Sequence, residues 1–548
     1  MLVQPLVFLS RFLSGVERAG TTTVPPLVNF QVQQPPALPS FGTQCTVELV
    51  HHLFGNSYYH PAIVQYTPPT TCGDVGKWAG VSLNYTATSK GRQYDRLTAV
   101  TLHNVEIWRT STAEPTKTGI IWTALKDVSR YIPLFSQPGT LILDLNNIVA
   151  PNIGLTGEYD VTLTATFYEP SILYPSAKTS SQIIPLTNLS PDQPNYFGVP
   201  PSFNIDVTLP TNTAEAYAEI YASGNADEEF WYNNAANKYF RQPAEWHNGF
   251  CLHSGGGGAS SFCHESQCQK GGHFCRPIAA YGAFDQPTYK VDLTPFVPLL
   301  ADGQVILSLL TLPPPKTTMV VQDQSSKPTT GKILSYSAPA YATADTTGII
   351  VTGSGKSNLV KWTQDLSFHN FQSYSQDANY QVVQQSATGK SLSTHNGVPV
   401  VSDTFSYPLD IVYYNIAYGN TTGWYASVNH SYDRSETPSP LIVGCDISTT
   451  QYGAGTYLRT NGEVTANGTT TETFRFADYA GNTYTRSVSA TNSSVTADEQ
   501  GGTLSSSWPL PWAIGGSSSV SSDGGGAHDQ FAVRVLDRRI LGDISTIW

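Results

Sequence analysis

The sequence predicts an all-β protein of several domains. Only 13% of its 548 residues are charged, about half the usual share, and 45 Gly and 37 Pro residues favour frequent turns. Apolar and polar side chains alternate in many segments. A helical bundle would need more charged residues on its helix surfaces, and 40% hydrophobic residues are too many for a disordered chain.

Alternation with period two predicts individual strands. In residues 158–169 every second side chain is apolar, as in a half-buried antiparallel strand. Residues 141–145 and 205–209 repeat this pattern, and residues 474–488 resemble a hairpin. No segment has the period of an amphipathic helix of three turns. The spacing of turns over residues 28–170 is typical of a sandwich or jelly roll.

Shifts in composition divide the chain into six segments. We expect an N-terminal segment, two β domains, a Pro-rich linker, a third β domain and a Gly/Ser-rich tail. Their boundaries are 1–27, 28–185, 186–312, 313–335, 336–514 and 515–548.

Charge and composition exclude some partners and indicate a compartment. The net charge is −12, and no Lys/Arg cluster is present that would bind nucleic acid. The sequence contains no run of about 18 apolar residues, so it predicts no membrane span. Asn-x-Ser/Thr sequons favour a secreted or secretory-pathway protein, although Arg11 interrupts the apolar N-terminus and no convincing signal peptide follows. The sequons lie at Asn84, Asn188, Asn420, Asn429, Asn467 and Asn492.

Seven cysteines cannot all pair within one chain. Cys45 and Cys72 flank a strand-like segment and are the expected disulfide partners. Four more cysteines crowd into residues 251–275, but their spacing matches no paired Cys-x-x-Cys zinc knuckle, so we predict no metal site there.

Two stretches contain candidate chemistry. The first holds Asp95-Arg96 and, after a strand, Glu114-Pro115; these residues could also be a solvated ion pair and a turn. In the second, residues 227–232, three carboxylates run into three aromatic residues. A carboxylate packed against aromatic rings loses hydration, which raises its pKa toward a value useful for proton transfer. A solvated acidic loop before a core strand is the alternative.

Several of these segments resemble the peptide N-glycosidase A family of plants and fungi. The motifs are Tyr-Asp-Arg-Leu (94–97), Trp-Arg-Thr-Ser-Thr-Ala-Glu-Pro-Thr (108–116), Gly-Ile-Ile-Trp-Thr (119–123), Glu-Phe-Trp-Tyr (229–232) and Arg-Pro-Ile (276–278). The similarity covers residues 45 to about 303 and continues more weakly to about 492, and we interpret the chain as a fungal-type member.

The resemblance implies an amidase that needs no cofactor. It would cleave the bond between the first N-acetylglucosamine of an N-glycan and the asparagine side chain of a glycopeptide or glycoprotein, at acidic pH, leaving Asp and a glycosylamine. The implied fold is two adjacent jelly rolls, each an eight-stranded antiparallel sandwich, with the site at their interface. The C-terminal β domain is additional.

A more remote similarity to the bacterial peptide N-glycosidase suggests roles for individual residues. Asp95 corresponds to the principal catalytic Asp, Glu229 to a second-domain acid with Glu228 beside it, and Arg276 to a substrate-orienting arginine. Arg109 or Arg276 could keep Asp95 ionised, and Trp122 and Trp231 could stack on sugars. The expected substrate-binding residues are Arg109, Glu114, Trp122, Trp231 and Arg276.

Residues 246–276 depart from the family pattern, as do residues 312–321. The expected alternation is missing there, so the second jelly roll would lack core strands. The alternative function is therefore a catalytically impaired glycan-binding or surface protein with the same fold. A glycoside hydrolase is a third hypothesis, because it also uses paired carboxylates.

Overall fold

The structure is a computed structural model and describes fifteen stretches of the chain. They are residues 27–32, 43–172, 174–187, 190, 192–193, 203–207, 209–223, 277–297, 305–309, 322–323, 334–351, 355–375, 379–437, 444–478 and 481–505. The prediction of an all-β protein is confirmed, since the elements there are almost all strands.

The N-terminal region is a sandwich of two sheets. The first sheet has the order β1-β8-β5-β10-β3 and the second β4-β9-β6-β7. Apolar side chains from both sheets, such as Val161 and Leu143, form one core. The strands are β1 (Val28–Asn29), β3 (Gln44–Phe54), β4 (Ala62–Tyr66), β5 (Gly80–Lys90), β6 (Leu97–Leu102), β7 (Val105–Ser111), β8 (Ile120–Asp127), β9 (Gly139–Leu145) and β10 (Glu158–Tyr168).

Short strands form the second region. Three pairs are described: β11 with β15, β12 with β14, and β13 with β2. The eight-stranded second jelly roll stays a prediction, because most of residues 224–304 lie outside the described part. These strands are β2 (Gln31–Val32), β11 (Phe203–Val207), β12 (Tyr217–Tyr221), β13 (Ile278–Ala279), β14 (Thr288–Asp292) and β15 (Val305–Leu309).

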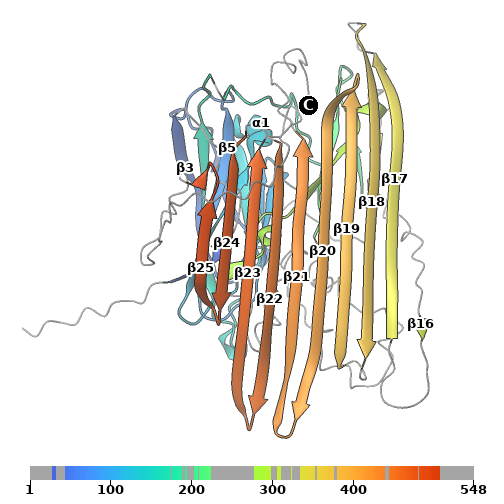
Figure 1. Cartoon of the computed structure of the whole chain (residues 1–548). Helices are drawn as coiled ribbons and strands as arrows, with labels where there is room; N and C mark the ends of the chain where they lie inside the picture. The colour runs from blue at the N-terminus through green and yellow to red at the C-terminus, as the bar shows by residue number, and fades with distance from the viewer. Residues whose placement is uncertain are drawn as a thin grey trace, which may run out of the picture.

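The C-terminal region is one antiparallel ten-stranded sheet in which consecutive strands are neighbours. In Figure 1 its long strands cross the front of the molecule, and the N-terminal sandwich lies behind the β22–β25 end. The strands are β16 (Gln322–Asp323), β17 (Leu334–Val351), β18 (Ser357–Ser375), β19 (Tyr380–His395), β20 (Val398–Tyr418), β21 (Thr421–Thr437), β22 (Cys445–Thr460), β23 (Glu463–Asp478), β24 (Thr483–Thr491) and β25 (Ser494–Gly501).

The helices that the structure describes are single turns, and none of them is long enough to cross a membrane. One of them, α3, has a structural role: Phe284 packs on Trp122 of the sandwich, and Tyr281 packs on Phe474 of the long sheet. The helices are η1 (Ser129–Tyr131), α1 (Ile132–Phe135), η2 (Pro151–Ile153), α3 (Tyr281–Phe284) and η7 (Thr294–Phe296).

Local sequence predictions are confirmed at several places. β10 coincides with the alternating segment 158–169, and β9 contains residues 141–145. β23 and β24 form the predicted hairpin. The predicted disulfide between Cys45 and Cys72 is present, and it joins the start of β3 to the loop that precedes β5.

Candidate functional site

Two carboxylates lie at the same end of the β6–β7 ladder. The ladder pairs Leu97 with Ser111, and the Thr112 N–H donates to the Arg96 carbonyl at 3.0 Å, which extends it by one pair. Asp95 directly precedes Arg96, Glu114 follows Thr112 by two residues, and their side chains are only 7% and 2% exposed. The alternative of a solvated ion pair at Asp95 and Arg96 does not hold, because both side chains are buried, whereas Glu114-Pro115 lies in the irregular segment after β7 and is buried there.

Tyr159 lies close enough to both carboxylates for their charges to affect its hydroxyl. Its hydroxyl donates to the Tyr94 carbonyl at 2.8 Å. Burial raises the pKa of Tyr159 well above its ordinary value, and the negative charges of Glu114 and Asp95 raise it further, whereas Thr112 and Arg96 oppose the shift. We call Asp95 and Glu114 the carboxylate pair. Arg96, which follows Asp95 in the chain, carries the positive charge that acts on Tyr159 together with them.

Arg109 connects the sandwich to the second region. Its Nε and Nη2 donate to the two carboxylate oxygens of Glu106 at 2.6 and 2.7 Å, and its Nη1 donates to Ser223 Oγ at 2.9 Å. The Tyr221 ring lies beneath the guanidinium, 5.7 Å from Cζ to the ring centroid. The positive charge of Arg109 is therefore paired with Glu106. If Arg109 kept Asp95 ionised, it would be expected to pair with Asp95 instead.

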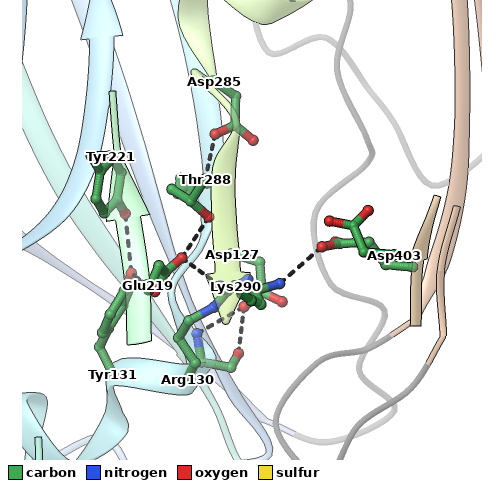
Figure 2. A network of polar contacts seen from close by, with 12 residues as sticks. Asp127, Arg130, Tyr131, Glu219, Tyr221, Asp285, Thr288, Lys290 and Asp403 are labelled. Atoms are coloured by element: carbon green, nitrogen blue, oxygen red, sulfur yellow. Dashed lines mark hydrogen bonds and ion pairs between the residues drawn. The ribbon is translucent and has the colours of Figure 1, made fainter. Parts of the chain in front are cut away.

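Glu219 on β12 is the centre of a largely buried polar network between the sandwich and the second region (Figure 2). Its carboxylate accepts from Arg130 Nη1 at 2.7 Å, Tyr131 Oη at 2.7 Å and Thr288 Oγ1 at 2.6 Å. Burial opposes ionisation of Glu219, but Arg130, Lys290 and these hydrogen bonds outweigh it and lower its pKa to about 2.

The same network continues into the long sheet. Lys290 Nζ donates to Glu436 Oε1 at 2.9 Å, and Arg434 Nη2 donates to both the Thr288 carbonyl and Asp403 Oδ2, at 2.8 and 2.7 Å. The strands β12 and β14 are thus fixed on one side to the sandwich and on the other to the C-terminal sheet. These contacts hold Ser223 in place beside Arg109.

A second buried cluster joins the second region to the C-terminal sheet. His395 Nδ1 lies 3.2 Å from Glu215 Oε1, and its Nε2 lies 3.2 Å from Asp292 Oδ2. Ser393 Oγ donates to the same Asp292 oxygen. Burial disfavours the imidazolium, but the hydrogen bonds and charges of Asp292 and Glu215 prevail and raise the pKa of His395 to about 9.

These groups predict that the fold is most stable in mild acid. The pKa of His395 rises from 6.5 to about 9, so its contribution is complete below pH 6.5 and is lost as the pH rises through 9. Burial raises the pKa of Glu472 from 4.5 to about 8, so its cost to stability grows as the pH rises from 4.5 to 8. Burial lowers the pKa of His430 from 6.5 to about 3, so its cost disappears as the pH rises from 3 to 6.5, and the two changes offset each other between pH 4.5 and 6.5. Glu219 acts oppositely: its contribution is complete above pH 4.5 and is lost as the pH falls toward 2.

Thermal unfolding from pH 4 to 9 checks this expectation. The midpoint should be highest between about pH 4.5 and 6.5, and the His395 contribution of about 2–3 kcal/mol should disappear at alkaline pH. The variant His395→Gln should lose stability mainly in acid and so have a flatter profile. A wild-type midpoint that increases steadily from pH 6 to 9 would contradict the assignment.

One sequence prediction about substrate contact is wrong. Trp122 is 0% exposed, and its ring packs on Tyr85, Tyr159 and Phe284. A side chain without exposed surface cannot stack on a sugar, so Trp122 belongs to the core. The other candidates Glu228, Glu229, Trp231 and Arg276 lie outside the described residues, as does the Cys-rich stretch 251–275.

The predicted glycosylation sites differ in their surroundings. Asn420, Asn429, Asn467 and Asn492 are exposed on the C-terminal sheet or its turns. Asn84 is half-buried on β5, and its Oδ1 accepts from Thr86 Oγ1 at 3.1 Å. Asn188 lies outside the described residues.

Comparison with known proteins agrees with this architecture. Residues 28–256 and 272–326 match the model of the family peptide N-acetyl-beta-D-glucosaminyl asparaginase amidase A. The gap between the two matches falls inside the predicted departure at 246–276. Residues 335–409 match the C-terminal domain model of the same family.

A curated relative agrees with the family models. The chain is 30% identical over 311 residues to a peptide-N4-(N-acetyl-beta-glucosaminyl)asparagine amidase A of Prunus dulcis. The alignment covers 51% of this chain and about half, 53%, of the relative, which is a plant protein, so the fungal-type assignment stays a prediction. No solved structure matches. With more than half of its residues matched by the family model, the chain belongs to the peptide N-acetyl-beta-D-glucosaminyl asparaginase amidase A family.

Proposed function

We propose that the protein is an amidase that hydrolyses the bond between N-acetylglucosamine and asparagine in N-glycosylated peptides or proteins. The observation that carries the proposal is the buried carboxylate pair, Asp95 and Glu114, at the end of a ladder whose neighbouring Arg109 binds Ser223 of the second region. Family membership and the Prunus dulcis relative support the reaction class.

The reaction needs two acidic groups with different tasks. An amide is a poor electrophile with a poor leaving group, so one carboxylate must activate the attacking water or the carbonyl while an acid protonates the departing nitrogen. We assign the first task to Asp95 and the second to Glu229, with Glu228 as its neighbour. The site needs no metal in this scheme, since both tasks belong to carboxyl groups.

Covalent geometry limits how far Glu229 can lie from the contact between Ser223 and Arg109. Glu229 follows Ser223 by six residues, and an extended chain advances about 3.3–3.6 Å per residue, so its reach from the Arg109 contact is about 20 Å. Arg109 would then position the second region and not neutralise Asp95. Arg276 and Trp231 are proposed to orient the glycan.

The proposed working pH is acidic, and the proposed location is the secretory pathway or the cell exterior. A donor with an ordinary Glu pKa loses its proton at neutral pH and with it the ability to protonate the leaving group. The Cys45–Cys72 disulfide and the exposed sequons favour an oxidising compartment.

Incubation of the protein with an N-glycopeptide at about pH 5 tests the proposal. We expect free glycan and a peptide in which Asp replaces the glycosylated Asn. A glycoside hydrolase would instead leave one N-acetylglucosamine on the Asn. An unchanged glycopeptide that nevertheless binds the protein would support the catalytically impaired alternative.

A further inference from the structure

The loop between β3 and β4 holds two tyrosines, and the first of them contacts Arg96, the residue after Asp95. Tyr59 is 88% exposed and Tyr58 is 37% exposed. Their rings meet edge to face with centroids 6.0 Å apart. They present aromatic surface to solvent at the edge of the sandwich, and we call them the Tyr58–Tyr59 platform.

A β-turn sets the backbone conformation of Tyr59. The His60 N–H donates to the Ser57 carbonyl at 3.0 Å, so Tyr59 is the third residue of a four-residue turn. Its φ is +59°, and a turn with a positive φ at this position usually has Gly or Asn there. The turn therefore directs a large aromatic ring into solvent at a position that small residues usually fill.

The rest of the loop is rigid. The Tyr59 N–H donates to Asn146 Oδ1 at 3.0 Å, and the Val149 N–H donates to Asn56 Oδ1 at 2.8 Å. Ser57 Oγ donates to the Leu145 carbonyl at 2.6 Å. Hydrogen bonds therefore fix both sides of the exposed rings, so a ligand would find them in place and little ordering entropy would be lost on binding.

Arg96 ties the platform to the carboxylate pair. Its guanidinium lies over the rings of Tyr58 and Tyr94, 5.9 Å from each centroid, and its Nη1 donates to Tyr58 Oη at 3.3 Å. Arg96 is buried, and it directly follows Asp95 in the chain. The platform is thus anchored one residue from the proposed catalytic Asp95.

We propose that Tyr59, supported by Tyr58, is a specificity-determining residue that binds the sugars of the N-glycan beyond the first N-acetylglucosamine. A tyrosine combines an apolar face, which fits the C–H surface of a pyranose ring, with a hydroxyl that can contact sugar hydroxyls. This inference rests on the proposed function, because the identity of the ligand comes from it.

Two glycopeptides with the same peptide test the inference, one carrying a full N-glycan and the other a single N-acetylglucosamine. For Tyr59→Ala we expect KM to rise about tenfold on the full glycan, with kcat little changed, and to stay constant on the single sugar. Tyr59→Phe should retain most of the affinity because it keeps the ring. Tyr418→Ala removes another exposed tyrosine, on the C-terminal sheet (64% exposed), and should leave KM and kcat on both substrates unchanged. An equal rise of KM on both substrates would place Tyr59 on the peptide and overturn the inference.

Binding of the free N-glycan to the full-length Asp95→Asn variant, measured by calorimetry, gives a readout that needs no turnover. Adding Tyr59→Ala should weaken this binding about tenfold. Cleavage by the wild type with unchanged glycan binding in the double variant would overturn the inference and leave the proposed function standing. If the wild type does not cleave the glycopeptide but glycan binding still depends on Tyr59, the proposed function is overturned and the inference about Tyr59 stands.

Discussion

Replacing Asp95 by Asn should abolish deglycosylation. The substitution keeps the size of the side chain but removes the negative charge that activates water or the carbonyl, so we expect the rate to fall by about 10³-fold or more. Because the negative charges of Asp95 and Glu114 both act on the buried Tyr159, removing one of them should leave the thermal stability nearly unchanged. The rate of glycan release from a glycopeptide and a melting curve of each protein check this.

Matched variants separate catalysis from general damage. Glu114→Gln should lower the rate less than Asp95→Asn if Glu114 only binds substrate, and Asp160→Asn, in an exposed pair with His51, should be neutral. Comparable activity in Asp95→Asn and the wild type would remove Asp95 from the mechanism.

The second large effect is expected at Glu219. Glu219→Ala leaves Arg130 and the buried Tyr131 without the carboxylate that they contact, so the free energy of unfolding should fall by about 2–3 kcal/mol, between the values for an exposed and a buried pair. Denaturant unfolding measures this. The same truncation of the exposed Asp160 should cost only about 0–1 kcal/mol.

The activity of the Glu219 variant carries further information. Because this network holds β12 and β14 against the sandwich, glycan release should decrease in Glu219→Ala even at temperatures where the protein is folded, and Glu219→Gln should recover part of it. A stable Glu219→Ala protein with full activity would show that the network does not position the second region.

Local regularity explains which parts of the fold could be predicted. β10 alternates strictly between core and solvent, so its sequence alone predicts it. The long strands β18–β23 bury Gln, Ser and Thr as well as apolar residues, which weakens the periodic signal. Their arrangement in a single ten-stranded sheet depends on long-range pairing that no local pattern contains.

The candidate site was predictable only in part. The sequence identified Asp95 and Glu114, but exposure depends on tertiary packing, so it could not show that Trp122 belongs to the core. Glu219 was missed, although a signal was present: it shares one face of β12 with Tyr217 and Tyr221, and an acid between two aromatic residues on a strand face is a candidate for a buried network. Tyr59 was missed because a positive φ cannot be inferred for a tyrosine.

We propose that this protein hydrolyses the side-chain amide of the glycosylated asparagine at a site that contains Asp95. Hydrolysis of a glycopeptide in heavy-oxygen water, followed by mass spectrometry of the peptide, tests it most directly. We predict one heavy oxygen in the new Asp side chain with the wild type and none with Asp95→Asn. A peptide that keeps Asn with a single N-acetylglucosamine, or an equal label from both proteins, would contradict the account.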